Sequence, residues 1–326
     1  MTTPDIAMKK SRVPADLIEI GAMFGLLVAT VSFFTVMAPG FFSPGIFTSM
    51  AYQLPELGIL TLAMLLPILS GGLNLAVTFT ANVAGLVAAW ILVQVTGDAS
   101  AGIIIVAILA ALATGALIGA AIGALVAYTG AHPILVSLGF MILLRGAGEW
   151  FTRGGDISGM PEFFRFVGHG TLLYVPVPLI IFIAAVALWV LVLHYTRLGF
   201  SIYMIGSNAK AALYSGIDVA RVQITLYALS GLMSAVAGIV MLSRFNSVRI
   251  GHGESYLLIM ILACFLAGAN PFGGFGRVLP VALGLVSLQV ISSGLNLMGV
   301  SQHFATATWG IFLILVMVIR APFQQR

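Results

Sequence analysis

GIIIVAILAALATGALIGAAIGALVAY, residues 102–128, forms an apolar block without a single charged side chain. A helix of this length is long enough to cross the hydrocarbon core of a bilayer. Cuts at glycine, proline and charged residues divide the rest of the chain into nine similar blocks. These lie at 17–38, 51–70, 75–95, 133–151, 175–195, 222–243, 255–269, 278–292 and 304–320. The pattern predicts an all-α polytopic membrane protein with about ten transmembrane helices.

The composition of the whole chain supports this fold class. Of the 326 residues, 60% are hydrophobic and 7% are charged, and the mean hydropathy is +1.13. A water-soluble protein normally carries about a quarter charged residues. We therefore expect a single transmembrane domain over residues 17–320, in contact with membrane lipid. Residues 1–16 and 321–326 are expected to form short cytoplasmic tails.

The distribution of basic residues predicts the orientation of the chain. Cytoplasmic loops of inner-membrane proteins carry an excess of Lys and Arg. The formal charge of +4 arises from scattered basic residues, which form no run that could follow a phosphate backbone, so we expect no nucleic-acid partner. Both termini are predicted to be cytoplasmic in a bacterial inner membrane, because most basic residues then lie inside: Lys9, Lys10, Arg12, Arg197, Lys210, Arg221, Arg277, Arg320 and Arg326.

The chain lacks the motif of an ATPase. Its three lysines, Lys9, Lys10 and Lys210, do not follow a glycine, as the lysine of a phosphate-binding loop does. A transporter of this sequence must therefore take ATP energy from other chains or use an ion gradient.

An ion-coupled secondary carrier of a small polar solute is the alternative function. Such a carrier is expected to place paired ionisable groups within its spans, and the candidates are Glu56 and the pair Arg145 and Glu149. Arg145 and Glu149 are four residues apart, so they share a helix face and can neutralise each other. The spacing favours a structural ion pair near the outer interface over a proton relay.

Signatures of an enzyme or a metalloprotein are missing from the sequence. The five histidines are isolated, without H-E-x-x-H or paired-ligand spacing, and no nucleophile elbow is present. Cys264, the only cysteine, lies in an apolar stretch and is expected to be a small buried side chain. We expect a transport subunit with no catalytic residue, metal site or cofactor of its own.

Two loops are long enough to have structure of their own. The outer loop, 152–174, is expected to cover the pore mouth or to form a docking surface, with Phe163, Phe164 and Phe166 as interfacial anchors.

The inner loop, 196–221, predicts a short helix with Ser207 or Asn208 as N-cap and Gly216 as its end. A helix this short must pack against the membrane domain or a partner subunit to be stable. Its small side chains allow close approach and its larger ones offer specific contacts: Ala209, Ala211 and Ala212, with Lys210 and Tyr214.

A second set of polar residues follows the Gly71-Gly72 pair. Such a pair can interrupt helices where protein or a watery cavity satisfies the backbone. Asn74, Thr78 and Asn82 are four residues apart and would share one face of a helix. They are either polar contacts in the solute pathway or interhelical hydrogen bonds worth roughly 1 kcal/mol each.

A short repeated sequence adds one further candidate residue for the solute pathway. Gly72-Leu-Asn-Leu75 matches Gly294-Leu-Asn-Leu297, which makes Asn296 a second pathway candidate if the chain contains an inverted repeat. A chance match in a chain rich in Leu and Gly is the alternative.

Four segments carry a resemblance to a known family. They are GFSIYMIGSNAKAALYSGIDVAR at 199–221, YALSGLMSAVAGI at 227–239, GANPFGGFGR at 268–277 and SGLNLMGV at 293–300. In these segments the chain resembles permeases of bacterial ATP-binding-cassette (ABC) importers for ribose, xylose, arabinose and related monosaccharides, a group that includes autoinducer-2 permeases. SGGLNLAV at 70–77 is similar to the family's G-G-I-D-L-S-V-G segment but departs from it, with Asn74 in place of Asp and Ala76 in place of Ser.

The resemblance implies a function and a set of partners. The chain would give alternating access to a monosaccharide or similar small polyol, driven by separate ABC ATPase subunits. Residues Ser207–Gly216 would form the coupling helix that sits in a groove of the ATPase. A periplasmic sugar-binding protein would dock on the outer face, and a second permease copy, identical or not, would complete the pathway.

Overall fold

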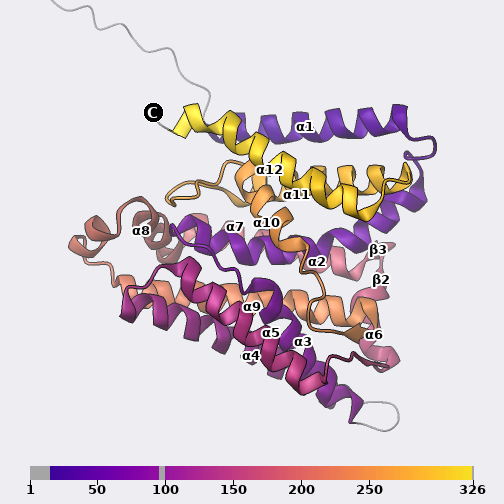
Figure 1. The fold of residues 1–326 in the computed structure, drawn as a ribbon, viewed down its shortest axis with the longest axis horizontal. Coiled ribbons are helices and arrows are strands. Elements are labelled where there is room, and N and C mark those ends of the chain that lie inside the picture. Colours follow the sequence, from indigo (N-terminus) through magenta and orange to yellow (C-terminus); the bar gives the residue numbers. More distant parts are fainter. Residues whose placement is uncertain (1–14, 95–99, 325–326) are drawn as a thin grey trace, which may run out of the picture.

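The computed structural model describes residues 15–94 and 100–324, which fold into a helical bundle (Figure 1). Its long helices are α1 (Ala15–Met37), α2 (Pro44–Leu69), α3 (Val77–Val93), α4 (Ala101–Thr129), α5 (Pro133–Thr152), α7 (Val177–Tyr195), α9 (Val219–Phe245), α10 (Tyr256–Leu266), α11 (Val278–Leu297) and α12 (Gln302–Gln324). Two more helices lie in the long loops, α6 (Glu162–His169) and α8 (Arg197–Tyr214). We call the two ends of the bundle the α6 end and the α8 end.

Each predicted apolar block corresponds to one of the ten long helices, so the prediction of an all-α polytopic membrane protein is confirmed. Within the described residues, α1, α2, α4, α5, α7, α9 and α11 are long and apolar enough to cross a membrane, whereas α3, α10 and α12 contain shorter apolar stretches. The count of ten spans stays a prediction. Of the two predicted tails, 1–14 and 325–326 lie outside the described residues, while α12 extends to Gln324.

Helix α2 is the centre of the bundle. Of its most apolar window, 89% is buried, and it packs against α7, α9, α10 and α11. The outer helices instead expose large apolar side chains, such as Leu117 on α4 and Ile183 on α7. Apolar side chains exposed on this scale suit a hydrocarbon solvent, because in water they would form an aggregation-prone surface.

Helices α4 and α9 pack closely through small residues. Gly115, Gly119 and Gly123 recur every four residues on α4, and a Cβ atom at Gly119 would clash with the backbone carbonyl of Tyr227 on α9. A Cβ at Gly231 of α9 would in turn clash with the carbonyl of Gly115. Small residues at this spacing allow membrane helices to approach at the backbone.

The α6 end is closed by the outer loop. Two short antiparallel pairs brace it: β1 (Ile157–Ser158) pairs with β4 (Ser247–Val248), and β2 (Thr171–Leu172) pairs with β3 (Val175–Pro176).

Helix α6 is tied to the end of α9. The Ser243 hydroxyl accepts from the Gly168 amide at 2.7 Å and donates to the Phe164 carbonyl at 2.8 Å. Phe164 is fully buried, so its prediction as an interfacial anchor is wrong, while Phe163 and Phe166 are exposed. The sequence pattern did not separate these three aromatics, because their burial depends on how α6 lies on α9.

A non-helical segment, residues 246–255, connects α9 to the short helix α10. With 11 residues α10 rises about 16 Å, which is less than the ~30 Å of a hydrocarbon core. Gly251 and Gly253 have positive φ angles, and the His252 carbonyl accepts from Asn82 Nδ2 on α3 at 3.1 Å. The segment therefore enters the bundle from the α6 end and contacts α3.

Candidate coupling and solute sites

Helix α8 consists of two helical pieces joined at Asn208, whose backbone is extended with φ −162° and ψ 103°. The Asn208 Oδ1 atom accepts from the Ala211 amide at 3.0 Å, which is the bond of an N-cap. Gly216, with φ +81°, ends the second piece, and the Ile217 amide donates to the Ala212 carbonyl at 3.1 Å. The predicted helix start is thus Asn208 and the predicted end at Gly216 is confirmed.

We call residues 208–216 the α8 tip. Most of its side chains are exposed, among them Ala209, Lys210, Ala211 and, at 90% exposure, Tyr214; Ser207, just before the tip, is exposed as well. Ala212 is the exception, because it is fully buried within this chain. In this structure its side chain is inaccessible to a partner, and its contact with the ATPase stays a prediction.

Three glycines connect the first piece of α8 to two other breaks in the chain. A Cβ at Gly206 would clash with the Leu69 carbonyl at the end of α2 and with the Gly274 amide. Gly273 lies against the backbone of Gly71 and Gly206. The Gly274 amide also donates to the Leu69 carbonyl at 2.9 Å. We call Gly71, Gly206 and Gly273 the glycine junction; it joins α8, the end of α2 and the 267–277 turn by backbone contact.

Tyr203 adds a side-chain bond beside the glycine junction. Its hydroxyl donates to the Gly276 carbonyl at 2.7 Å. Burial raises the pKa of Tyr203 to about 12, so the hydroxyl keeps the proton that it donates at physiological pH.

The break between α2 and α3 is held by Asn74, which is buried. Asn74 Nδ2 donates to the Ser230 hydroxyl on α9 at 3.2 Å, and Asn74 Oδ1 accepts from the Ala76 amide at 3.1 Å. Ser230 in turn donates to the Ala63 carbonyl on α2 at 2.7 Å. These contacts favour the interhelical alternative for Asn74, because they use both ends of its amide.

Thr78 and Asn82 are also buried, on α3. Asn74 precedes α3, which begins at Val77, so only Thr78 and Asn82 share a helix face. Asn82 bonds the carbonyl of His252. The Thr78 hydroxyl has no hydrogen-bond partner among the described residues, and its role in a solute pathway stays a prediction.

Asn296 does not join this group. It is exposed in the last turn of α11 at the α6 end, whereas Asn74 lies in a non-helical segment at the α8 end. The two Gly-Leu-Asn-Leu segments thus have different local structures, which favours a chance match over an internal repeat.

The predicted pair of Arg145 and Glu149 is present, with 3.1 Å between Nε and Oε1. Arg145 also reaches Glu254 of the 246–255 segment, with 3.1 Å between Nη1 and Oε1. All three side chains are about half exposed, at 50%, 49% and 54%. Sequence analysis did not find Glu254, because no local pattern links it to α5.

A second ion pair is buried. Glu56 on α2 is 3.2 Å from Nη1 of Arg244, in the last turn of α9, and accepts from the Tyr256 hydroxyl at 2.6 Å. The Glu56 side chain is 2% exposed and that of Arg244 is 19% exposed. The pair joins α2 to the end of α9, as a structural ion pair does.

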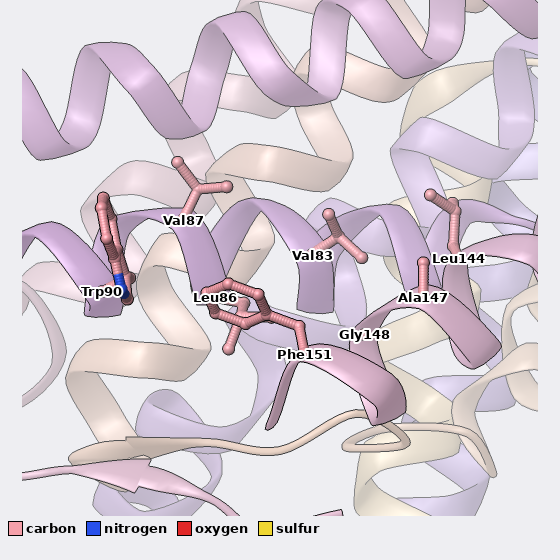
Figure 2. Close-up of a pocket in the computed structure, with 8 residues that line it drawn as sticks. All are labelled: Val83, Leu86, Val87, Trp90, Leu144, Ala147, Gly148 and Phe151. Atoms are coloured by element: carbon pink, nitrogen blue, oxygen red, sulfur yellow. The ribbon is translucent and has the colours of Figure 1, made fainter. Parts of the chain in front are cut away.

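A cavity of about 400 Å³ lies between α3 and α5 (Figure 2). Apolar side chains line it, and a sugar would find no hydrogen-bond partners for its hydroxyl groups there. Its lining residues are Val83, Leu86, Val87, Trp90, Leu144, Ala147, Gly148 and Phe151. Nor do the described residues bring together three His, Cys, Asp or Glu side chains that could hold a metal ion.

Comparison with known protein families shows which family this chain belongs to. The profile of the family described as "Branched-chain amino acid transport system / permease component" matches residues 46–321, from α2 to α12. The chain belongs to this permease family. It is therefore the transport component of an importer and a multi-pass protein of the inner membrane, as the sequence predicted.

Several characterised permeases are similar over most of their length. The ribose import permease RbsC of Escherichia coli strain K12 is 33% identical over 328 residues, 98% of each chain. RbsC of Bacillus subtilis is 33% identical over 325 residues, again 98% of each. The autoinducer 2 import permease LsrD of Yersinia enterocolitica is 35% identical over 271 residues, 81% of this permease and 80% of LsrD. No solved structure shows significant similarity to the chain.

Proposed function

We propose that this permease moves a monosaccharide or similar small polyol into the cell and takes its energy from separate ABC ATPase subunits. The observation that carries this proposal is the similarity to two ribose permeases over 98% of the chain. An importer of this kind alternates between outward and inward access, and the permease itself does no covalent chemistry.

The α8 tip is the proposed contact with the ATPase. It is capped at Asn208 and presents Lys210 and Tyr214, and the first piece of α8, which precedes it, is in backbone contact with the end of the central helix α2 at Gly206. A movement of the tip would therefore reach α2 and the break that follows it. Ser207, Ala209 and Ala211 complete the proposed contact surface.

The proposed orientation places the α8 end in the cytoplasm, together with both termini. Lys210, Arg221 and Arg277 lie at this end, as the positive-inside rule favours. The α6 end would then face the periplasm, where a sugar-binding protein docks on the outer loop. A second permease copy completes the pathway, because an ABC motor has two nucleotide sites and one chain offers one α8 tip.

Uptake by proteoliposomes tests the proposal. The permease is reconstituted with a candidate ABC ATPase and a candidate sugar-binding protein, and accumulation of D-ribose, D-xylose and L-arabinose is measured. We expect ATP-dependent uptake of at least one sugar. Uptake by the permease alone, driven by an ion gradient without ATP, would identify an ion-coupled carrier instead.

A cap variant then tests the role of the α8 tip. Asn208→Ala removes a cap worth about 1 kcal/mol from a short exposed helix, so we expect uptake and ATPase stimulation to fall several-fold. Asn208→Asp keeps a good cap and should retain most of the activity. Equal activity of both variants would exclude the tip as the coupling element.

A further inference from the structure

The charged cluster of Arg145, Glu149 and Glu254 lies where a membrane protein rarely exposes charge. Arg145 is seven residues from the end of α5, which places it about 10 Å below that helix end. At the centre of a membrane helix, a charged side chain in contact with hydrocarbon costs about 2.5–3.5 kcal/mol. Since half of each side chain is exposed, the surroundings of the cluster must be something other than hydrocarbon.

The backbone beside the cluster gives a second, independent indication of water. Glu254 belongs to the non-helical 246–255 segment, which reaches Asn82 of α3 through the His252 carbonyl. Irregular backbone at membrane depth is stable only where it is buried in protein or lines a water-filled cavity. Glu254 is 54% exposed, so at this residue the segment is not buried in protein.

The cluster also retains capacity to bind a ligand. One guanidinium faces two carboxylates, so the three side chains carry one excess negative charge. Ser255, which follows Glu254 in the chain, is exposed as well, so the opening extends along the 246–255 segment. The Phe79 ring, 5.9 Å from Arg145 Cζ, forms one wall.

The buried ion pair of Glu56 and Arg244 provides the contrast. Glu56 and Arg244 are buried among α2, α9 and α10, with Tyr256 as a further partner, as expected of a structural pair. The pair of Arg145 with Glu149 is open on one side, and a structural pair has no need of that opening.

We propose that Arg145, Glu149 and Glu254 line a water-filled part of the solute path and bind the hydroxyl groups of the transported polyol. This rests on the proposed function as a sugar permease. Vicinal hydroxyls can donate to the two carboxylates while accepting from the guanidinium, and hydrogen bonds to charged groups are the stronger kind. The apolar cavity on the adjacent face of α5 offers no such partners.

Water access is tested by cysteine labelling of the full-length permease in open membrane fragments. Cys264 is fully buried and serves as a silent background. We expect Ser255→Cys, beside Glu254, to react with a membrane-impermeant maleimide. Leu117→Cys, on the charge-free and 70% exposed face of α4, is the matched control and should stay unlabelled. Labelling at neither position, or at both equally, would overturn the water-filled path without affecting the proposed transport function.

Sugar binding is tested by protection and by substitution. D-Ribose, or the sugar that the uptake assay selects, should slow labelling of Ser255→Cys, and Glu149→Gln should remove this protection. Glu149→Gln should also lower uptake at saturating binding protein about tenfold, because a hydrogen bond to a charged group is lost. Asp218→Asn, an exposed change outside the α8 tip that keeps the N-cap of α9, is the control. Labelling that the transported sugar leaves unchanged would show that the cluster only braces α5, and would refute the polyol site.

Discussion

Charged side chains occupy two different environments in this permease. Glu56 and Arg244 are enclosed, whereas Arg145 and Glu149 are half exposed at membrane depth. The four-residue spacing of the exposed pair made it visible in the sequence. The buried pair joins α2 to the end of α9, so no local pattern could reveal it.

The buried pair leads to a prediction about stability. Arg244→Leu leaves the Glu56 carboxylate buried without its counter-charge, which should destabilise the protein by about 3–5 kcal/mol. Thermal unfolding of the purified permease in detergent should therefore shift to lower temperature. The double variant Glu56→Gln with Arg244→Leu should recover much of this loss, since Tyr256 can still donate to the amide oxygen.

An exposed pair serves as the control for that measurement. Arg221 and Asp218 are 84% and 55% exposed, and such surface pairs are worth about 0–1 kcal/mol. Arg221→Ala should thus leave the unfolding temperature nearly unchanged. A shift as large as that of Arg244→Leu would contradict the assignment of Glu56 and Arg244 as the structural pair.

Local chemistry also decided which residues of the α8 tip could be predicted. The cap at Asn208 and the end at Gly216 depend on neighbours within a few residues, so the sequence identified them. The burial of Ala212 depends on how the tip is rotated against the bundle. The bond from Asn74 to Ser230 likewise requires knowing that two distant segments meet.

At the scale of elements, each long helix follows from an apolar block, but the contacts between helix ends do not. The glycine junction brings together the end of α2, the first piece of α8 and the 267–277 turn. Each glycine reads in the sequence as an ordinary break or turn residue. Only the assembled bundle shows that these backbones touch.

The glycine junction predicts an asymmetry between two glycine substitutions. Gly206→Ala would push a methyl group into backbone atoms of Leu69 and Gly274, which cannot rotate away as a side chain could. We expect a lower unfolding temperature and loss of ATP-driven uptake. Gly25→Ala on α1 meets open space and should stabilise its helix by about 0.5–1 kcal/mol. Equal stability of the two variants would rule out close packing at Gly206.

At the scale of the whole molecule, the bundle is arranged around α2, with the α8 tip at one end and the outer loop at the other (Figure 1). Composition and block length predicted this fold class, because hydropathy directly reflects the solvent of each helix. The central place of α2 was not predictable, since its mean hydropathy of 1.5 equals that of the peripheral helix α5.

The two ends provide a test of orientation in intact cells. Tyr174→Cys, fully exposed at the α6 end, should react with a membrane-impermeant thiol reagent. Lys210→Cys, exposed on the α8 tip, should react only after the cells are permeabilised. The reverse labelling pattern would show that the permease has the opposite orientation, with both termini outside the cell.

The helices that enclose Glu56 of α2 are synthesised long after α2 itself. The tyrosine that binds Glu56 is synthesised 200 residues after it, which takes roughly 10–40 s at about 5–20 residues per second. Arg244 follows Glu56 by nearly as long. During this interval the acidic helix has left the ribosome without the partners that enclose it. Biogenesis therefore requires that Glu56 is accommodated without Arg244 and Tyr256 until α9 and α10 have been made.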